Sequence, residues 1–256
     1  MRQLTVLKIG GELIQEPEKL SAVLTHFTAL QGAKILVHGG GRDATALSEQ
    51  MGVIPQMIDG RRVTDATQLE IATMVYAGKV NTQLVAQLSA YGEKALGING
   101  SDLGIIQCNK RPVVPVDFGY VGDITTVNGS TLVELISLGL CPVFSAITSD
   151  LKGQLLNTNA DTVATAIAKA ILSDFSVRLV YVMGIPGILA DITNPSTLIP
   201  KLSFDQYLNL KASGRLSGGI LPKLSNAFEA LKAGVSEVII ANETTLISGK
   251  YTELCL

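Results

Sequence analysis

The sequence predicts an α/β fold, a three-layer α/β/α sandwich built around an open, mainly parallel, twisted sheet. Short apolar runs recur along the chain and alternate with longer segments in which apolar residues follow a helical period. Runs that are apolar throughout are typical of parallel strands, because both faces of such strands are buried. The predicted strands cover residues 4–9, 34–38, 95–98, 142–145, 179–183 and 237–241.

Glycines mark the ends of the predicted helices, and this is the second observation in favour of the fold. Glycine often follows a helix because it adopts the left-handed backbone conformation easily. Gly32, Gly52, Gly92, Gly139 and Gly234 lie at such positions. The predicted helices cover residues 17–31, 44–51, 66–91, 131–138, 160–173 and 220–233.

The segment 107–124 departs from this alternation. It is rich in valine and proline and contains Gly119-Tyr120-Val121-Gly122, so we expect a β-hairpin before the main sheet resumes. The chain has no low-complexity linker, and we expect a single continuous fold with a soft boundary near residues 172–174. This boundary separates an N-terminal lobe, 1–172, from a C-terminal lobe, 173–256.

Composition limits the classes of function. A chain of 256 residues with 47% hydrophobic content can bury a large core. Its 20 basic and 22 acidic residues are nearly balanced and form no basic stripe, so we expect a small ligand and no nucleic acid. The widely spaced Cys108, Cys141 and Cys255 fit neither a disulfide framework nor a metal site. Without a signal peptide or a membrane-spanning run, we expect a cytoplasmic protein with no membrane partner.

Two glycine-rich turns follow predicted strands. Lys8 precedes Gly10-Gly11, and His38 precedes three glycines at 39–41. Consecutive glycines let a ligand approach the backbone, and a helix that begins there directs free N–H groups at an anion. Neither turn has the spacing of the Walker or dinucleotide-binding motif, which disfavours a Rossmann-type dehydrogenase. We expect Lys8 to neutralise a charged ligand, and His38 to bond neighbouring backbone rather than act as a base.

A basic segment and a polar segment supply further candidates. Arg62, in Gly60-Arg61-Arg62-Val63-Thr64, can clamp a carboxylate with two parallel hydrogen bonds, although one of the two arginines can also be simply solvated. Asn157-Thr158-Asn159-Ala160-Asp161 places two amides and a carboxylate at a predicted helix start. Asn159 or Thr158 can cap that helix, but one cap does not need three polar groups.

Asp161 and two lysines favour phosphoryl transfer. The helix dipole favours the ionised carboxylate of Asp161, which can pair with lysines. Lys223 follows a third glycine turn, Ser217-Gly218-Gly219, near the start of a predicted helix. Two lysines, an aspartate and glycine turns can align and neutralise a moving phosphoryl group. The sequence offers no Ser-His-Asp set, paired glutamates or metal cluster for another reaction.

Over nearly its whole length the chain resembles the N-acetylglutamate kinases of the amino acid kinase family. Seven segments occur in the family's order, and together they are far more specific than any one of them. The Arg-Val-Thr and Asn-x-Asn-Ala-Asp elements favour this branch over the carbamate, uridylate, aspartate and glutamate kinases. The matching segments are Lys8-Ile9-Gly10-Gly11, Val37-His38-Gly39-Gly40-Gly41, Gly60-Arg61-Arg62-Val63-Thr64, Gly119-Tyr120-Val121-Gly122, Asn157-Thr158-Asn159-Ala160-Asp161, Gly187-Ile188-Leu189 and Gly218-Gly219-Ile220-Leu221-Pro222-Lys223.

The resemblance implies ATP-dependent phosphorylation of the γ-carboxylate of N-acetylglutamate, an early step of arginine biosynthesis. Lys8 and Lys223 would stabilise the transition state, and Asp161 would hold both lysines. Gly10 and Gly11 would supply backbone hydrogen bonds along the path of the phosphoryl group. A substrate carboxylate would bind to an arginine. The substrate-binding residues implied are Gly40, Gly41, Arg62, Asn157 and Asn159.

The resemblance places ATP in the C-terminal lobe, and the acylated amino acid and a dimer interface in the N-terminal lobe. Magnesium would arrive on the ATP phosphates and water, with no dedicated metal site in the protein. The chain begins with only Met1-Arg2-Gln3 before its first strand, whereas arginine-inhibited members carry an additional helix there, so we expect an arginine-insensitive homodimer. The nucleotide-binding residues implied are Gly184, Ile185, Pro186, Gly187, Ile188, Leu189, Arg215, Leu216 and Ser217.

Three positions depart from the family pattern. Gly184 stands where an aspartate usually precedes the Gly-Ile-Leu turn, so a polar contact near the nucleotide is missing. Arg42 and Arg61 add cations near the substrate, and they motivate N-succinylglutamate, with its additional carboxylate, as an alternative substrate. A ligand-sensing protein without turnover is a second alternative, which Gly184 favours and the retained Asp161 and lysines oppose.

Overall fold

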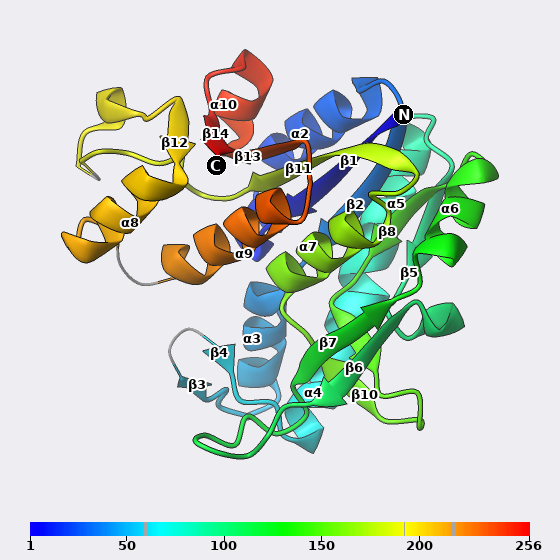
Figure 1. The fold of residues 1–256 in the computed structure, drawn as a ribbon. Coiled ribbons are helices and arrows are strands. Elements are labelled where there is room, and N and C mark those ends of the chain that lie inside the picture. Colours follow the sequence, from blue (N-terminus) through cyan, green and yellow to red (C-terminus); the bar gives the residue numbers. More distant parts are fainter. Residues whose placement is uncertain (59–60, 192, 217–218) are drawn as a thin grey trace.

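The computed structural model describes residues 1–58, 61–191, 193–216 and 219–256, and it confirms the predicted three-layer α/β/α fold (Figure 1). The central sheet has eight strands in the order β12-β14-β13-β11-β1-β2-β8-β5. All neighbouring pairs are parallel except β13 and β14. The strands are β1 (Arg2–Ile9), β2 (Ala33–His38), β5 (Ala95–Ile98), β8 (Cys141–Phe144), β11 (Phe175–Val182), β12 (Lys201–Ser203), β13 (Glu237–Ala241) and β14 (Thr252–Cys255).

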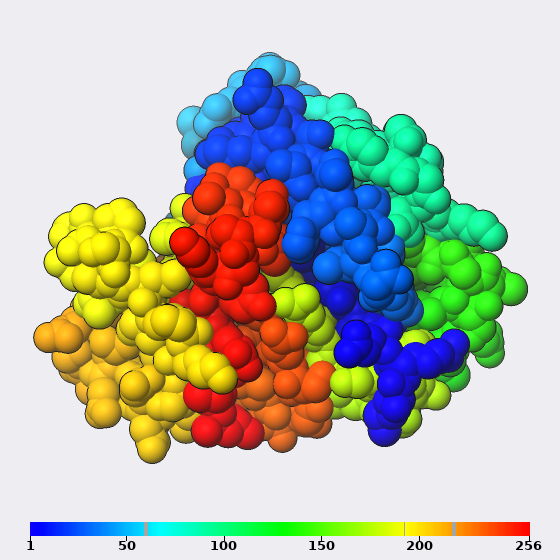
Figure 2. Space-filling model, turned by 90° about the horizontal axis from the view of Figure 1, so that it is seen from above, coloured from blue at the N-terminus to red at the C-terminus, as the bar shows by residue number. Residues whose placement is uncertain are grey.

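Helices cover both faces of this sheet. In Figure 1, α7 (Ala160–Ala170) and α9 (Ile220–Lys232) lie in front of it, whereas α2 (Pro17–Ala29) and α5 (Asn81–Ala90) lie behind. Figure 2 shows the C-terminal residues against the N-terminal ones, where α10 (Glu243–Ser248) contacts α2. None of the described helices is long and apolar enough to cross a membrane. The remaining helices are α1 (Gly11–Ile14), α3 (Gly41–Gln50), α4 (Ala66–Ala72), α6 (Gly129–Ser137) and α8 (Phe204–Ala212), with short 3₁₀ turns at Asp102–Gly104 and Pro195–Thr197.

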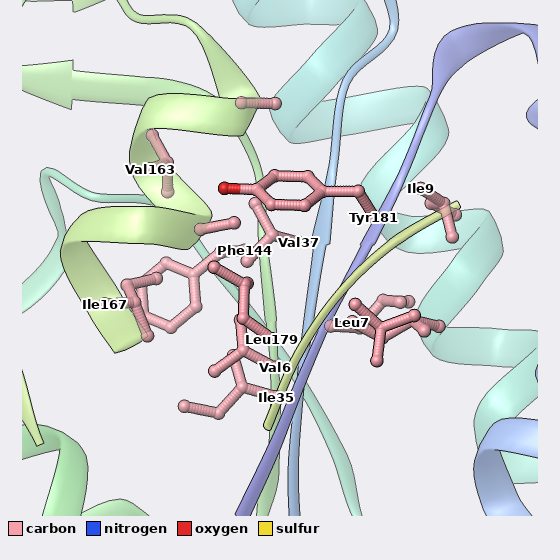
Figure 3. Packing of buried hydrophobic residues seen from close by; sticks show 14 of the residues in the cluster. Val6, Leu7, Ile9, Ile35, Val37, Phe144, Val163, Ile167, Leu179 and Tyr181 are labelled. Carbon is pink, nitrogen blue, oxygen red and sulfur yellow. The ribbon is translucent and has the colours of Figure 1, made fainter. Parts of the chain in front are cut away.

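The apolar runs form strands that are buried on both faces. Successive side chains of a strand point to opposite faces of a sheet. Val6 and Leu179 point toward α7, on the side where Ile167 lies, whereas Leu7 and Ile9 point to the opposite side (Figure 3). All five side chains are almost completely buried. The continuous apolar character of β1 and β11 therefore follows from helices on both sides.

The predicted hairpin within 107–124 is confirmed, and it belongs to a second, four-stranded sheet. Strands β6 (Ile106–Lys110) and β7 (Gly122–Val127) pair in antiparallel fashion. Strands β9 (Ile147–Ser149) and β10 (Leu155–Asn157) complete this sheet, in the order β10-β9-β6-β7. The sequence prediction missed β9 and β10, because three-residue strands are too short to show a period.

The helix predicted at 66–91 is continuous but not α-helical throughout. Between α4 and α5, the segment η1 (Thr73–Val80) is π-helical. In a π-helix each carbonyl oxygen accepts a hydrogen bond from the N–H group five residues later. Short π-helical segments are frequent at functional sites. The apolar pattern did not reveal it, because a π-helical insertion changes the helical period only slightly.

The predicted helix-ending glycines are confirmed. Gly32, Gly52, Gly92, Gly139 and Gly234 follow α2, α3, α5, α6 and α9, with φ angles of 86°, 73°, 89°, 74° and 107°. Residues other than glycine adopt such angles at a cost in energy. Gly52, Gly92, Gly139 and Gly234 come two residues after the last helical residue, whereas α2 ends at Ala29 and Leu30 is already extended before Gly32.

Candidate active site

The candidate site lies where the strand order reverses. The chain passes from β1 to β2 on one side, and β11 later pairs with β1 on the other side. Ligands in open α/β sheets bind at the carboxyl ends of strands around such a point. The turns after all three strands meet there, because Gly10 N–H donates to Val182 O (3.2 Å) and Gly39 N–H donates to Ile9 O (3.4 Å).

The structure brings Lys8, Asp161 and Lys223 together. Lys8 Nζ lies 2.7 Å from Asp161 Oδ1, and Lys223 Nζ lies 2.6 Å from Asp161 Oδ2. The lysines come from β1 and α9, and the carboxylate from the first turn of α7. Lys8 and Asp161 are buried, with 6% and 4% of their surface exposed, whereas Lys223 is partly exposed. One carboxylate therefore sets the positions of two ammonium groups.

Burial and charge act in opposite directions on these groups. Burial alone would raise the pKa of Asp161, but the charges of Lys8 and Lys223 outweigh it and lower the pKa to about 2. Burial lowers the pKa of Lys8, and the charge of Lys223 lowers it further, while Asp161 raises it. The carboxylate is therefore ionised at neutral pH, and the charge of Lys8 depends on it.

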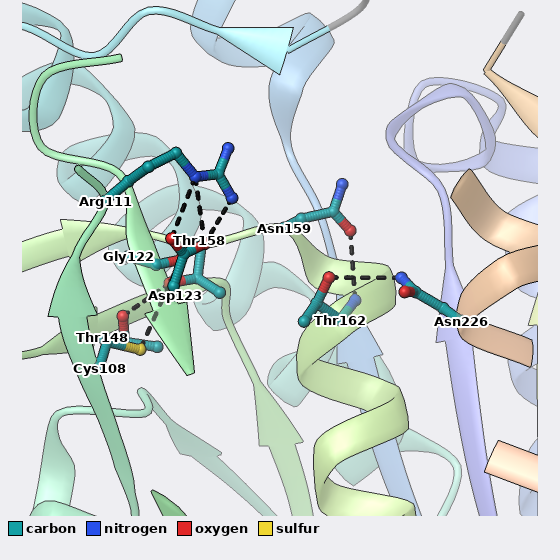
Figure 4. A network of polar contacts seen from close by, with 9 residues as sticks. All are labelled: Cys108, Arg111, Gly122, Asp123, Thr148, Thr158, Asn159, Thr162 and Asn226. Carbon is teal, nitrogen blue, oxygen red and sulfur yellow. Dashed lines mark hydrogen bonds and ion pairs between the residues drawn. The ribbon is translucent and has the colours of Figure 1, made fainter. Parts of the chain in front are cut away.

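Polar contacts fix the helices that carry these groups (Figure 4). Asn159 Oδ1 accepts hydrogen bonds from the N–H groups of Asp161 (2.8 Å) and Thr162 (3.2 Å), and so caps α7. Asn226 Nδ2 of α9 donates to Thr162 Oγ1 (3.3 Å), next to Asp161. Because Asn226 lies one turn after Lys223, this bond holds α9 in register with α7.

The two N-terminal glycine turns pack against each other. Gly11 begins α1 and Gly41 begins α3. A Cβ atom on Gly11 would lie 3.4 Å from Gly41 N, so a side chain there would press on the neighbouring turn. The predicted phosphoryl-path residues Gly10 and Gly11 and the predicted substrate residues Gly40 and Gly41 thus line one junction.

Arg62 is buried and points at the start of α3. Its Nη1 donates to Gln68 Oε1 (2.8 Å), and its Nη2 donates to Gly41 O (3.0 Å) and Thr45 Oγ1 (2.6 Å). Only 9% of the residue is exposed. Arg62 therefore occupies the predicted position beside Gly41, whereas Arg61 is exposed on the hairpin of β3 (Met57–Ile58) and β4 (Arg61–Arg62).

The two predicted substrate asparagines occupy different environments. Asn157 Nδ2 donates to Thr64 Oγ1 (3.0 Å), and Thr64 Oγ1 donates to Arg62 O (3.3 Å), so Asn157 lies close to the arginine. Asn159 uses its carbonyl oxygen to cap α7. The cap engages Oδ1 of Asn159, so the predicted substrate contact of this residue would have to come from its Nδ2.

The C-terminal strand and helix hold the predicted nucleotide segment, residues 184–189. Thr245 Oγ1 donates to Pro186 O (2.7 Å), and Ile188 N–H donates to Thr252 Oγ1 (2.8 Å). Gly187 has a φ of 148°, and a Cβ atom there would lie 2.6 Å from Leu198 Cδ1, so only glycine fits. The flanking Ile185 is partly buried and Leu189 pairs with Leu198.

The second predicted nucleotide segment follows α8. Arg215 and Leu216 donate their N–H groups to Leu210 O, at 3.1 and 3.3 Å. Ser217, the third predicted residue of this segment, lies outside the described residues, as do Gly60 and Gly218.

Arg42 and Gly184, two of the residues that depart from the family pattern, both lie beside Glu12. Arg42 of α3 forms an ion pair with Glu12 of α1. A Cβ atom on Gly184 would lie 2.6 Å from Glu12 Oε2, so the Glu12 carboxylate occupies the space beside Gly184. Arg42 is thus paired within the protein, and an acidic group lies near the nucleotide segment although Gly184 has no side chain.

His38 is a structural residue, as expected. It is fully buried, with Nδ1 2.7 Å from Gly39 O and Nε2 3.0 Å from Asn81 Nδ2. Burial lowers the pKa of His38 to about 4, although the hydrogen bond to Gly39 acts to raise it. The ring is therefore neutral at neutral pH. Its Nδ1–H donates to Gly39 O and its Nε2 accepts from Asn81, which leaves the ring no role as a base.

Several contacts of the site were not predicted. Gln68 and Thr45 hold the Arg62 guanidinium, and Tyr76 packs against Gly40. Of these residues, only Gln68 was indicated by the sequence. Asp65, three residues earlier, is a typical helix cap, and it places Gln68 in the first turn of α4. The partners of a buried arginine depend on how helices pack, and no local pattern encodes that.

An α/β sandwich in which one carboxylate holds two lysines beside glycine turns is the architecture of a phosphotransferase. Residues 3–242 match the amino acid kinase family. The acetylglutamate kinase of Phocaeicola vulgatus is 44% identical over 250 residues, which cover 98% of this chain and 97% of that one. The acetylglutamate kinase of Methanopyrus kandleri is 39% identical over 96% of this chain and 98% of its own. The chain belongs to the amino acid kinase family.

Solved structures agree with the fold. An N-acetylglutamate synthase from Neisseria gonorrhoeae, complexed with coenzyme A and N-acetyl-glutamate, has a TM-score of 0.84 at 22% identity. The match covers 99% of this chain and 59% of the synthase. A Giardia carbamate kinase has a TM-score of 0.69 at 14% identity and covers 98% of both chains. At such identities these likenesses establish the fold alone.

Proposed function

We propose that this protein catalyses ATP-dependent phosphorylation of the γ-carboxylate of N-acetylglutamate, an early step of arginine biosynthesis. The observation that carries the proposal is the buried Asp161 with Lys8 on one carboxylate oxygen and Lys223 on the other, at 2.7 and 2.6 Å. The similarity to acetylglutamate kinases over nearly the whole chain selects the substrate.

The chemistry needs charge neutralisation rather than a base. A carboxylate is ionised at neutral pH and attacks the γ-phosphorus directly, forming a new O–P bond as the bond to the β-phosphate oxygen breaks. Lys8 and Lys223 would neutralise the transferred group and the leaving oxygen from either side. The N–H groups of Gly11 and Gly41 lie at the adjoining turns, where they can donate to the moving oxygens.

The substrate would lie beside the Arg62 guanidinium and the start of α3, which contact each other. Arg62 is already oriented by Gly41 O and Thr45, and its remaining N–H groups can bind a substrate carboxylate. Asn157 and the amide of Asn159 would bind further polar groups of the acylated amino acid. ATP would bind to Gly184, Ile185, Pro186, Gly187, Ile188 and Leu189, and to Arg215, Leu216 and Ser217.

Magnesium would be held by the ATP phosphates and water. Both oxygens of Asp161 face lysines, and Glu12 faces Arg42, so these acidic side chains near the site are engaged by cations. Within the described ranges, no three acidic, histidine or cysteine side chains come together as a metal site. We therefore propose that the ATP phosphates, rather than a cluster of protein carboxylates, supply the main magnesium ligands.

We propose a cytoplasmic homodimer in which residues 1–172 bind the acylated amino acid and form the interface, and residues 173–256 bind ATP. Three free cysteines are in keeping with a reducing compartment. Met74, in the π-helical segment between α4 and α5, exposes 51% of its surface, in keeping with an interface on the N-terminal lobe. Light scattering tests the dimer, and a hexamer or monomer would contradict it.

Turnover assays test the activity. The wild-type protein should convert ATP to ADP with N-acetylglutamate, and Lys8→Ala should lose at least about 100-fold in kcat. The control Lys19→Ala changes an exposed lysine on α2 and should keep the wild-type kcat.

N-succinylglutamate serves as the competing substrate. Arg42 already pairs with Glu12, which disfavours its binding an additional carboxylate, so kcat/KM should favour the acetyl compound. No turnover with either substrate would favour a ligand-sensing protein.

A further inference from the structure

Tyr76 packs against the middle glycine of the second glycine turn. It lies in η1, and only 6% of its surface is exposed. A Cβ atom on Gly40 would lie 2.5 Å from Tyr76 Cδ1 and 3.0 Å from its Cε1, so the ring fills the space that a side chain at Gly40 would need. The aromatic ring therefore supports the backbone of the turn directly.

The hydroxyl of Tyr76 reaches the next glycine and Arg62. A Cβ atom on Gly41 would lie 3.9 Å from Tyr76 Oη, and Gly41 O accepts from Arg62 Nη2 (3.0 Å). Burial raises the pKa of Tyr76, although the nearby Arg62 opposes this, so the hydroxyl is protonated at neutral pH. It is available as a donor beside the predicted carboxylate-binding arginine.

A second contact from η1 reaches the same helix start. Lys79 Nζ lies 2.7 Å from Asp43 Oδ1, in the first turn of α3. Tyr76 and Lys79 are three residues apart, and both meet the residues that open α3. The π-helical segment therefore supports the start of α3 at two points, while Arg62 holds it at Gly41 and Thr45.

We propose that Tyr76 is a positioning residue for the acylated amino acid, because its ring, presented by the π-helical segment, fixes the Gly40–Gly41 backbone and the Arg62 guanidinium. This inference rests on the proposed function and on the family resemblance, which implies that Gly40, Gly41 and Arg62 bind that substrate. Tyr76 acts through Gly40, Gly41 and Arg62. It packs against the second glycine turn, which is the turn predicted to bind the acylated amino acid. Loss of the ring should therefore affect binding of the acylated amino acid far more than binding of ATP.

Steady-state kinetics of ring variants test the inference. Tyr76→Leu removes the ring but keeps an apolar side chain, and it should raise the KM for N-acetylglutamate about tenfold or more, because small displacements of positioning groups have large effects. The KM for ATP should stay within about twofold of the wild-type value. Tyr76→Phe keeps the ring and should remain close to wild type. Tyr91→Leu, at an exposed tyrosine that bonds Ser21, is the matched control and should change neither constant.

A double variant tests the contact itself. Gly40→Ala places a methyl group against the Tyr76 ring, and it should lower the Tm and raise the KM for N-acetylglutamate. Adding Tyr76→Ala removes the obstacle, so the double variant should lose less Tm than the two single changes together. Additive losses of Tm would overturn the inference, because the ring and the glycine would then not be in contact.

The outcomes separate the inference from the proposed function. Wild-type turnover together with an unchanged N-acetylglutamate KM in Tyr76→Leu would overturn the inference alone. Equal increases in both KM values would also overturn it, because they indicate a general disturbance of the fold. A wild-type protein without turnover or N-acetylglutamate binding would overturn the proposed function, and the inference with it.

Discussion

Asparagine in place of Asp161 keeps the shape of the side chain and removes its charge. The carboxylate has 4% of its surface exposed and faces one lysine at each oxygen. Asparagine resembles the protonated acid, so the comparison of wild type with Asp161→Asn isolates the ionised form. We expect consequences for both stability and rate.

The stability effect follows from the pKa of Asp161. Its fall from the ordinary value of 3.8 to about 2 corresponds to about 2 kcal/mol of unfolding free energy. The native pKa lies below the unfolded one, so this stabilisation is present above pH 3.8 and is lost as the pH falls toward 2. At pH 7 the wild type should be about 2 kcal/mol more stable than Asp161→Asn, and by pH 3 the difference should be about 1 kcal/mol.

The rate effect follows from the lysines. Without the carboxylate, the two ammonium groups repel each other and lose their common partner, so kcat should fall by about 100-fold or more. Burial and Lys223 both lower the pKa of Lys8, and Asp161 opposes them. Removing Asp161 therefore lowers the pKa of Lys8 further, and the alkaline limb of the kcat profile should move to lower pH.

Urea unfolding between pH 7 and pH 3 measures the first effect, and coupled ADP release across a pH series measures the second. The matched control is Asp123→Asn, because Asp123 pairs with Arg111 rather than with Lys8 or Lys223 (Figure 4) and its side chain is 46% exposed. It should change stability by less than about 1 kcal/mol and leave kcat unchanged. A kcat within about threefold of wild type in Asp161→Asn would refute the reasoning, since a transition-state stabiliser is worth far more. A stability difference that does not change with pH would refute the assigned ionisation.

Three further substitutions probe other parts of the site. Arg62→Lys replaces a planar fork with a point charge, so the KM for N-acetylglutamate should rise about tenfold or more while the KM for ATP stays constant in the same assay. Asn159→Ala removes the cap of α7 and should lower the stability by about 1 kcal/mol, seen as a Tm lower by about 2–4 °C; an unchanged Tm would contradict the capping role. Gly184→Asp places a second carboxylate against Glu12 and should raise the KM for ATP by competing for the same space, and unchanged nucleotide kinetics would show that the 184–189 segment does not bind ATP.

Much of the fold was predictable because buried parallel strands leave continuous apolar runs. Strands β5 and β13 have the predicted bounds, and the other predicted strands differ by a few residues at their ends. The sequence prediction missed helices α8 and α10, although each begins with a capping box. Ser203 and Gln206 form the box of α8, and Asn242 and Thr245 form that of α10. These helices have short apolar faces, so capping chemistry was the better signal.

The site was less predictable from residues alone. Lys8 and Asp161 are far apart in the sequence, and only the pairing of β1 with its neighbours and the packing of α7 on β1 bring them together. The helix-start position of Asp161 indicated that it could pair with lysines, and the family resemblance implied that it holds both Lys8 and Lys223. The π-helical segment that presents Tyr76 left no pattern, because it changes the helical period only slightly.

The arrangement around Asp161 explains why a carboxylate belongs in a site that binds anions. Two ammonium groups alone would repel each other, and burial would favour loss of the proton from Lys8. With Asp161 between them, the two lysines share an anionic partner and hold fixed positions before a phosphate arrives. Asp161 cannot move to follow the lysines, because the Asn159 cap and the start of α7 hold its backbone. The carboxylate therefore lowers the reorganisation needed when charge develops on the transferred group, and preorganisation of this kind is the main source of catalysis in phosphoryl transfer.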